Sequence, residues 1–356
     1  MLNAQDIVSK SIDVKRIAEK HSHAFSKCAR LTHQFKANVI SIFKQVYRVT
    51  SNKLALTIIT PLKPIASPEN RTQLKQEIEA CESLGETRDN KKIYLYHYQN
   101  DSALMREIGR LREEAFRLIG EGTGKPHDID LYDQHYMHIV LWDKDDLEVV
   151  GAYRLCATNN KEQLYTSSLF NYNSSTEDIL QAGLELGRSF IQPKYWGSRS
   201  LEYLWYGIAA FLLRNPQYRY LLGAVSISNT FTRPAKDLIA GYYQRFYTQE
   251  GLCATSKRPY KIENEAQQRV DQLFQGTKGK DAFLILKTQL RELGYAIPPL
   301  YKQYVDLTKP GGTRFLGFNI DPDFKDCVDG LVVVDITKMS EQKRKRYGLS
   351  HHQPTN

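Results

Sequence analysis

The sequence predicts a mixed α/β fold of the α+β type, in which helices flank a sheet that contains hairpins. Two observations favour this class. Strand-like and helix-like segments follow one another without the regular alternation of a doubly wound nucleotide-binding fold, and the charged turn 144–148 joins two neighbouring strands. A chain of 356 residues with 41% hydrophobic residues is also long enough to bury a substantial core.

The segment 183–191 is expected to be a central strand. Its apolar residues Leu184, Leu186 and Phe190 are interrupted by Glu185 and Arg188, and a mostly apolar helical segment follows. A carboxylate and a guanidinium on a central strand must be paired, be hydrogen-bonded or face a cleft. Two interpretations therefore stay open, a buried ion pair that only supports the fold and an active site.

The remaining elements follow from apolar periodicity and from turn residues. Strands are expected at 93–98, 137–143, 149–156, 220–228, 313–319 and 331–336. Helices are expected at 104–118, 200–214, 263–274 and 281–293, with one more that Asn229 caps and that ends at 241–247.

Three regions are predicted along the chain: a basic helical N-terminal extension and linker at 1–90, the main domain at 91–340, and a basic flexible tail at 341–356. Residues 1–60 carry ten Lys and Arg against three Asp and Glu. Such a basic amphipathic region either packs as a helical hairpin on the main domain or lies on an anionic membrane.

Composition excludes several classes of protein. The chain has no run of eighteen apolar residues and its first residues lack the apolar core of a secretory signal. Its five cysteines form no CxxC pair and its histidines no HExxH motif, so we expect a cytoplasmic protein with no metal. The net charge of +9 attracts polyanions such as nucleic acid, anionic lipid or an acidic protein.

Four short motifs occur in order, and together they resemble a known family. They are Leu111–Phe116 (LREEAF), Asp130–Asp133 (DLYD), Gly151–Leu155 (GAYRL) and Glu185–Arg188 (ELGR). This pattern resembles the acyl-carrier-protein-dependent branch of the GNAT superfamily, which includes the acyl-homoserine lactone synthases and the ornithine-lipid and N-acyl amino acid synthases. The resemblance covers roughly residues 93–336, and the segments 221–229, 297–302 and 318–324 look more like the lipid N-acyltransferases.

The resemblance implies a GNAT-like central sheet, mixed, mostly antiparallel and twisted, with helices on its faces. It implies an enzyme that moves a long-chain acyl group from acyl carrier protein, or from acyl-CoA, to the amine of an amino acid or similar small amine in lipid biosynthesis. The implied partners are the acyl carrier protein, the small amine and, as a peripheral contact, an anionic membrane at the inner leaflet. No bound cofactor and no nucleic acid are expected.

Acyl transfer to an amine requires a proton acceptor, stabilisation of the thioester oxygen and correct placement of both reactants. We hypothesise Glu185 as the general base, directly or through a water, with Arg188 beside it. An ion network is expected to shape the acceptor pocket, and backbone N–H groups near the end of strand 183–191 or at Ser226 and Ile227 are expected to meet the oxyanion. The members of this network are Arg112, Asp130, Asp133 and Arg154.

The phosphate of phosphopantetheine is expected at the start of the helix 200–214, through Gly197, Ser198, Arg199 and Ser200. Ordinary GNAT enzymes have a loop richer in glycine at this place, which favours a carrier-protein-bound donor over acetyl-CoA. The acyl chain is expected along the apolar side chains of 201–213, with Phe231, Tyr242 and Phe246.

Two other functions remain as alternatives. One is a synthase of acyl-homoserine lactone signals that uses S-adenosylmethionine, which the long C-terminal part disfavours. The other is a non-catalytic basic module that binds membrane or nucleic acid, although aromatic and basic residues alternate only at Tyr218–Tyr220 and Tyr243–Phe246.

Overall fold

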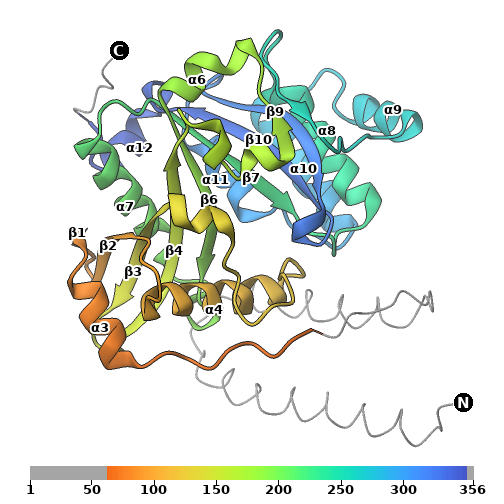
Figure 1. Ribbon diagram of the computed structural model, residues 1–356. Helices are drawn as coiled ribbons and strands as arrows, with labels where there is room; N and C mark the ends of the chain where they lie inside the picture. Colours follow the sequence, from red (N-terminus) through yellow and green to blue (C-terminus); the bar gives the residue numbers. More distant parts are fainter. Residues whose placement is uncertain (1–61, 351–356) are drawn as a thin grey trace, which may run out of the picture. The chain divides into compact units, whose positions relative to one another are not determined.

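The computed structural model of the protein describes residues 62–350, so the basic segment 1–60 and the last residues of the predicted tail lie outside the described residues. An eight-stranded sheet with the order β1-β2-β3-β4-β6-β7-β10-β9 forms the centre (Figure 1). The pair β6/β7 is parallel and all other neighbouring pairs of this sheet are antiparallel. The prediction of a mixed, mostly antiparallel sheet is therefore confirmed.

The strands agree closely with those expected from periodicity. Their bounds are β1 Glu82–Glu86, β2 Lys91–His97, β3 Met137–Asp143, β4 Glu148–Ala157, β6 Gly183–Ile191, β7 Tyr220–Ile227, β9 Thr313–Asp321 and β10 Cys327–Asp335, and a separate pair joins β5 (Phe170–Asn171) to β8 (Thr255–Ser256). The segment 183–191 is indeed a central strand, since β6 lies between β4 and β7.

Helices cover both faces of the sheet. They are α3 Arg71–Glu79, α4 Ala103–Leu118, α5 Thr166–Leu169, α6 Glu177–Gln181, α7 Ser200–Arg214, α8 Arg233–Tyr247, α9 Asn264–Leu273, α10 Gly279–Glu292, α11 Pro299–Asp306 and α12 Glu341–Arg346. Helix α8 begins later than expected. Its N-cap is Thr232, with Pro234 in the first turn, while Asn229 instead accepts a hydrogen bond from Lys236 Nζ.

The two faces of the sheet differ in polarity around β6. Leu155, Leu184 and Leu186 belong to the core that contains α7, so this face is apolar. Strand alternation sends their neighbours to the opposite face, where α4 and α5 pack. Arg154 and Glu185 therefore lie on the α4 side of the sheet, the side to which Arg112 of α4 also belongs.

Residues 82–86 are not a linker, as the sequence suggested, but the edge strand β1. Glu82 pairs in register with Leu95 of β2, and Leu84 is buried against the core. The predicted domain boundary near 85–92 therefore coincides with the turn of a hairpin. The physical reason is that a single apolar side chain on a short, charged edge strand gives almost no periodic signal.

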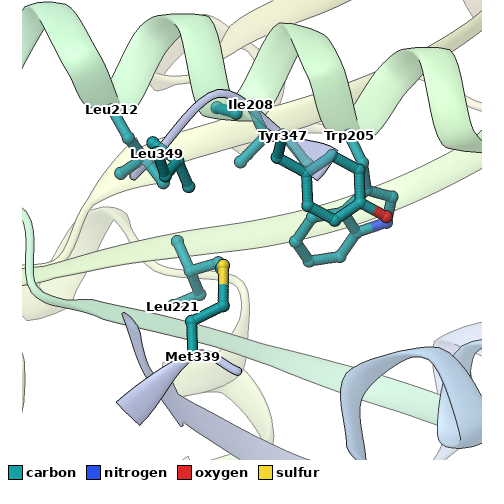
Figure 2. A pocket seen from close by; sticks show the side chains of 8 residues that line it. Trp205, Ile208, Leu212, Leu221, Met339, Tyr347 and Leu349 are labelled. Carbon is teal, nitrogen blue, oxygen red and sulfur yellow. The ribbon is translucent and has the colours of Figure 1, made fainter. Parts of the chain in front are cut away.

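The start of the predicted flexible tail is also folded, because 341–346 form α12 and the next residues enter the core. Tyr347 and Leu349 are buried in an apolar pocket with Trp205, Leu221 and Met339 (Figure 2). This pocket has a cavity volume of about 0 Å³ for a water-sized sphere, so side chains fill it. Across residues 62–350, no helix has the length and apolar character needed to cross a membrane.

Candidate active site

The central sheet opens between β6 and β7. The two strands pair at Gly183–Glu185 and Tyr220–Leu222, but both continue beyond this point, to Ile191 and Ile227. Gly223 lies where they begin to separate, and a Cβ atom there would overlap the carbonyl oxygen of Leu186. The opening therefore starts just beyond the pair Glu185 and Leu222.

A β-bulge at Arg188 distorts β6 beside this opening. The register between β4 and β6 shifts between Ala152 and Arg154, and Arg188 has a φ of +48°. Few residues other than glycine adopt such a φ, and bulges of this kind re-aim side chains next to functional sites. The bulge directs the Arg188 guanidinium between the rings of Tyr165 and Phe324, at 4.7 and 4.6 Å from their centroids.

Glu185 is buried, with 1% of its surface exposed, and both of its carboxylate oxygens accept hydrogen bonds. Tyr136 donates its hydroxyl to Oε1 at 2.6 Å, and the Thr166 hydroxyl donates to Oε2. Burial raises the pKa of Glu185, although the hydrogen bonds from Thr166 and Tyr136 oppose this shift. Glu185 and Arg188 therefore have different partners, and the simple ion pair between them is not formed.

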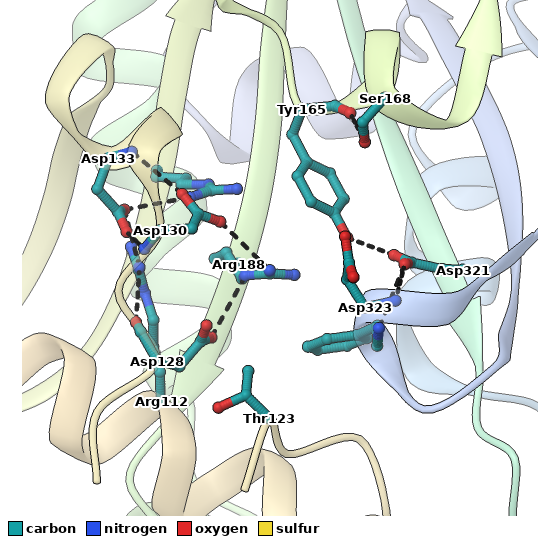
Figure 3. A network of polar contacts seen from close by, with 12 residues as sticks. Arg112, Thr123, Asp128, Asp130, Asp133, Tyr165, Ser168, Arg188, Asp321 and Asp323 are labelled. Atoms are coloured by element: carbon teal, nitrogen blue, oxygen red, sulfur yellow. Dashed lines mark hydrogen bonds and ion pairs between the residues drawn. The ribbon is translucent and has the colours of Figure 1, made fainter. Parts of the chain in front are cut away.

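The ion network predicted from the sequence is formed, and we call it the guanidinium network. It contains Arg112, Arg154, Arg188, Asp128, Asp130 and Asp133 (Figure 3). Arg112 binds Asp133 at 2.8 Å, and Arg154 binds Asp130 at 2.8 Å and Asp133 at 3.2 Å. Burial alone would raise the pKa of Asp133, but Arg112 and Arg154 hold it well below its usual value.

Local structure fixes the acidic half of this network. Asp130 caps the short 3-10 helix Leu131–His135 by accepting from the Asp133 N–H at 3.2 Å, and Asp133 Oδ2 accepts from the Asp130 N–H at 3.0 Å. Asp133 Oδ1 remains free to bind the two arginines. The motif DLYD therefore works as a rigid turn that presents carboxylates to Arg112 and Arg154.

Several donors of the guanidinium network have no acceptor. Among the described residues, Arg154 Nε and Nη2, Arg112 Nε and Nη2, and Arg188 Nε are buried without a hydrogen bond. Buried guanidinium donors without acceptors are costly. The network is therefore able to accept an anionic group from a ligand.

A second group of buried acids was missed by the sequence reasoning. This acidic cluster contains Glu121, Asp321 and Asp329, which are 8%, 1% and 1% exposed. Tyr165 donates its hydroxyl to Asp321, and Asp329 pairs in register with Ser226 of β7. The available signal was an aspartate inside the otherwise apolar strand Cys327–Asp335, the pattern that singled out Glu185.

Burial perturbs two members of the acidic cluster strongly. Desolvation raises the pKa of Glu121 to about 8, with Arg188 as an opposing charge. Desolvation and the neighbouring charge of Asp321 raise the pKa of Asp329 well above its usual value. Such shifts concentrate at functional sites, although structural clusters also produce them.

Replacing Glu121 by glutamine should make the stability of the protein less dependent on pH. The pKa of Glu121 is raised from 4.5 to about 8 by folding, so its contribution to stability is present at low pH and is lost as the pH rises from 4.5 to 8. Urea unfolding should show a gain of about 3–5 kcal/mol for Glu121→Gln over the native protein at pH 8, and about 1 kcal/mol or less at pH 5. The exposed Glu265→Gln is the control, and an equal difference at both pH values would contradict the assignment.

The other predicted site residues lie at the strand ends and at the start of α7. Gly197 has a φ of +80°, and at the start of α7 the side chain of Arg199 makes no cap, while Ser198 Oγ accepts from the Ser200 N–H at 3.2 Å. Arg199 is exposed and pairs with Glu202 at 3.0 Å. Ser226 is partly exposed, whereas Ile227 is buried in the core that contains α7 and α8, so only its backbone is available to the site.

The predicted acyl-chain cleft is not formed by the aromatic residues of α8. Tyr242 packs against Phe246 and Phe274 at 5.0 and 5.4 Å between ring centroids, which makes it part of the core. A separate cavity of about 350 Å³ lies beside the start of α8, and it contains none of the predicted site residues.

Comparisons with known proteins agree with this geometry. The family model described as "Acetyltransferase (GNAT) domain" matches residues 111–206. A glycine N(alpha)-acyltransferase of Phocaeicola vulgatus is 30% identical over 80% of this chain and 93% of its own length. An L-ornithine N(alpha)-acyltransferase of Rhodobacter capsulatus is 25% identical, over 71% and 94% of the two chains.

Solved structures give more distant matches. A CoA-dependent acyl-homoserine lactone synthase is 12% identical with a TM-score of 0.34, over 72% of this chain and 87% of its own. The loading GNATL domain of CurA from Lyngbya majuscula is 13% identical with a TM-score of 0.33, over 69% and 98%.

The opened sheet and the matching domain define an acyltransferase of the GNAT superfamily. The chain belongs to the family of N(alpha)-acyltransferases that contains the glycine enzyme of Phocaeicola vulgatus, and it transfers an acyl group to an amine.

Proposed function

We propose that this acyltransferase moves a long-chain acyl group from the phosphopantetheine of acyl carrier protein to the α-amine of a small amino acid, and that glycine is the first acceptor to test. The observation that carries the proposal is the opening between β6 and β7, with a buried guanidinium network beside it. The names of the glycine and ornithine relatives support an amino-acid acceptor. The product is an N-acyl amino acid, which is a building block of membrane lipids.

The donor thioester would enter along the opening, with its phosphate at the start of α7. Gly197 to Ser200 lead into a helix N-terminus whose N-cap residue, Arg199, makes no side-chain cap, although Ser198 Oγ accepts from the Ser200 N–H at 3.2 Å. The remaining N–H groups of the first turn suit an anion. Arg199 and the basic end of α12, whose Arg346 also contacts Glu202, add positive charge there. A carrier protein is acidic as a class, so this basic rim favours it over a neutral donor.

The acceptor's carboxylate would bind the free donors of the guanidinium network. Arg154 Nε and Nη2 are buried and lack acceptors, and a bidentate carboxylate satisfies such donors well. Arg112 and Asp133 would hold Arg154 in place from behind. This arrangement would favour amino acids over simple alkyl amines.

In this proposal Glu185 holds neighbouring residues in place and does not itself accept the proton of the amine. Its two oxygens already bind Tyr136 and Thr166, and the amine would have to displace one of them. Tyr136 in turn supports the guanidinium of Arg154, which lies 4.7 Å above its ring. The general-base role predicted from the sequence is thereby replaced by a role in fixing Tyr136 and the start of α5.

Purified protein incubated with palmitoyl-acyl carrier protein and glycine should yield N-palmitoylglycine, measured by mass spectrometry. Parallel reactions with palmitoyl-CoA, acetyl-CoA, ornithine and ethylamine would define donor and acceptor. A clear preference for acetyl-CoA, or equal use of ethylamine and glycine, would refute the proposal. Release of a homoserine lactone with S-adenosylmethionine would instead assign the protein to the signal synthases.

A further inference from the structure

We propose that Asp329, supported by Asp321 and Glu121, binds the ammonium group of the acceptor and accepts the proton that this group must lose. The inference rests on the proposed function, because it names the residues that handle the amine in that reaction. None of these three residues belongs to the four ordered motifs, although Asp321 lies in the segment 318–324 that resembles the lipid N-acyltransferases.

The position of Asp329 along the sheet supports this role. The last residue pair that joins β6 to β7 is Glu185 with Leu222. Four residues further along each strand lie Ser189 in β6 and Ser226 in β7. Parallel strands rise equally per residue, so Ser226 and the bulge at Arg188 lie at the same level on opposite sides of the opening. Asp329 pairs with Ser226 and therefore lies level with the bulge, whereas Glu185 lies several residues deeper.

No cation of the described residues forms an ion pair with the acidic cluster, although the charge of Arg188 acts on Glu121. Among the described residues, no ion pair involves Glu121, Asp321 or Asp329, and Asp329 Oδ1 is buried without any hydrogen-bond partner. Asp321 and Glu121 both act on Asp329 as like charges. Three buried carboxylates without a counter-ion are unfavourable, and a bound ammonium group would relieve this cost.

The guanidinium network, on the other side of Tyr165, lacks acceptors for some of its donors. Arg154 Nε and Nη2 lack acceptors, and the ring of Tyr165 lies 5.4 Å from this guanidinium group and 4.7 Å from that of Arg188. The hydroxyl of the same tyrosine donates to Asp321 (Figure 3). Tyr165 therefore lies between the guanidinium network, which can bind an anion, and the acidic cluster, which can bind a cation. An amino-acid zwitterion carries both charges.

Local structure holds Glu121 at this place. Glu113 is fully buried and accepts from Thr123 N at 2.9 Å and Gly124 N at 2.8 Å, which fixes the loop after α4.

The proton balance of the step is simple. One proton of the ammonium group moves to Asp329 Oδ1, and the free amine then attacks the thioester carbonyl carbon. As the C–S bond breaks, the nitrogen loses a second proton, which the departing thiolate accepts. The amide and the free thiol leave, and Asp329 returns its proton to water. No oxidant, metal or further reactant is needed.

The test compares Asp329→Asn with Asp323→Asn. Asp323 is a matched control because it is also an aspartate, its side chain is exposed, and it lies in the short turn that precedes β10. With glycine and the acyl donor, Asp329→Asn should lower kcat/KM by 10²–10⁴-fold and raise the KM for glycine, and it should remove the rise of the rate with pH. The control should stay within about threefold of the native enzyme. Removing one of three like charges should leave the Tm of Asp329→Asn equal or higher.

A binding measurement separates this inference from the proposed function. By calorimetry, glycine should bind Asp329→Asn at least tenfold more weakly, whereas N-acetylglycine, which lacks the ammonium group, should bind both proteins equally. Native kinetics and native glycine affinity in Asp329→Asn would overturn the inference while leaving acyl transfer intact. Absence of transfer by the native protein, with no glycine binding, would overturn both. If Asp329→Asn does not fold, Glu121→Gln must show at least a tenfold loss of glycine affinity, or the inference fails.

Discussion

Replacement of Arg154 by methionine should destabilise the protein by about 3 kcal/mol and abolish acyl transfer. Arg154 is 1% exposed and its guanidinium binds both Asp130 and Asp133. Methionine fills a similar volume but leaves these buried carboxylates with less compensating charge, and Arg112 then remains as the partner of Asp133. Urea unfolding followed by circular dichroism would measure the loss of stability.

The matched control is Arg199→Met, because Arg199 pairs with Glu202 on the surface, where its side chain is 54% exposed. Exposed ion pairs contribute about 0–1 kcal/mol, so this variant should unfold almost as the native protein does. A loss for Arg154→Met no larger than for Arg199→Met would show that the guanidinium network contributes little to the fold.

Replacement of Gly223 by alanine should cost about 3 kcal/mol of stability and lower the rate of acyl transfer at least tenfold. A Cβ atom at this position would overlap the backbone oxygen of Leu186, and backbone cannot move aside as a flexible side chain can. The strands β6 and β7 would have to separate earlier, which would displace the walls of the opening. Thermal unfolding and the transfer assay together would measure both effects.

Gly187→Ala provides the comparison on the facing strand. A Cβ atom there would meet its nearest neighbour, Arg154 Nε, at 3.6 Å, which is an ordinary contact. We expect a stability change below about 1 kcal/mol for this variant. Equal stability of the two alanine variants would mean that β6 and β7 adjust freely, and the opening would then not be a rigid feature.

Much of the fold followed from residue patterns that local physics controls. Apolar alternation identified β6 and β7, and the capping residue Ser102 with the apolar positions of Leu104 and Ile108 identified α4. The buried charges of β6 indicated a polar site on a central strand, because such charges need partners wherever they occur. Their motif context indicated the family, which the relatives confirm.

Other features depend on contacts between distant segments. Tyr347 and Leu349 follow a strongly basic stretch and gave no signal of burial, yet Trp205 and Met339 provide an apolar pocket for them. Asp329 is separated from Glu121 by most of the domain in sequence, so no local pattern relates them. Only the pairing of β10 with β7 brings Asp329 to the opening.

The sequence by itself determined the sheet's central strand, four residues of the guanidinium network (Arg112, Asp130, Asp133 and Arg154) and the class of reaction, because each depends on local periodicity or on a short motif. The tertiary structure decided which partner each charge has. It assigned Glu185 to Tyr136 and Thr166, gave Asp133 to Arg112 and Arg154, and left Asp329 without a counter-ion. The physical reason is that burial and pairing depend on through-space distance, which chain order does not encode for residues on separate strands.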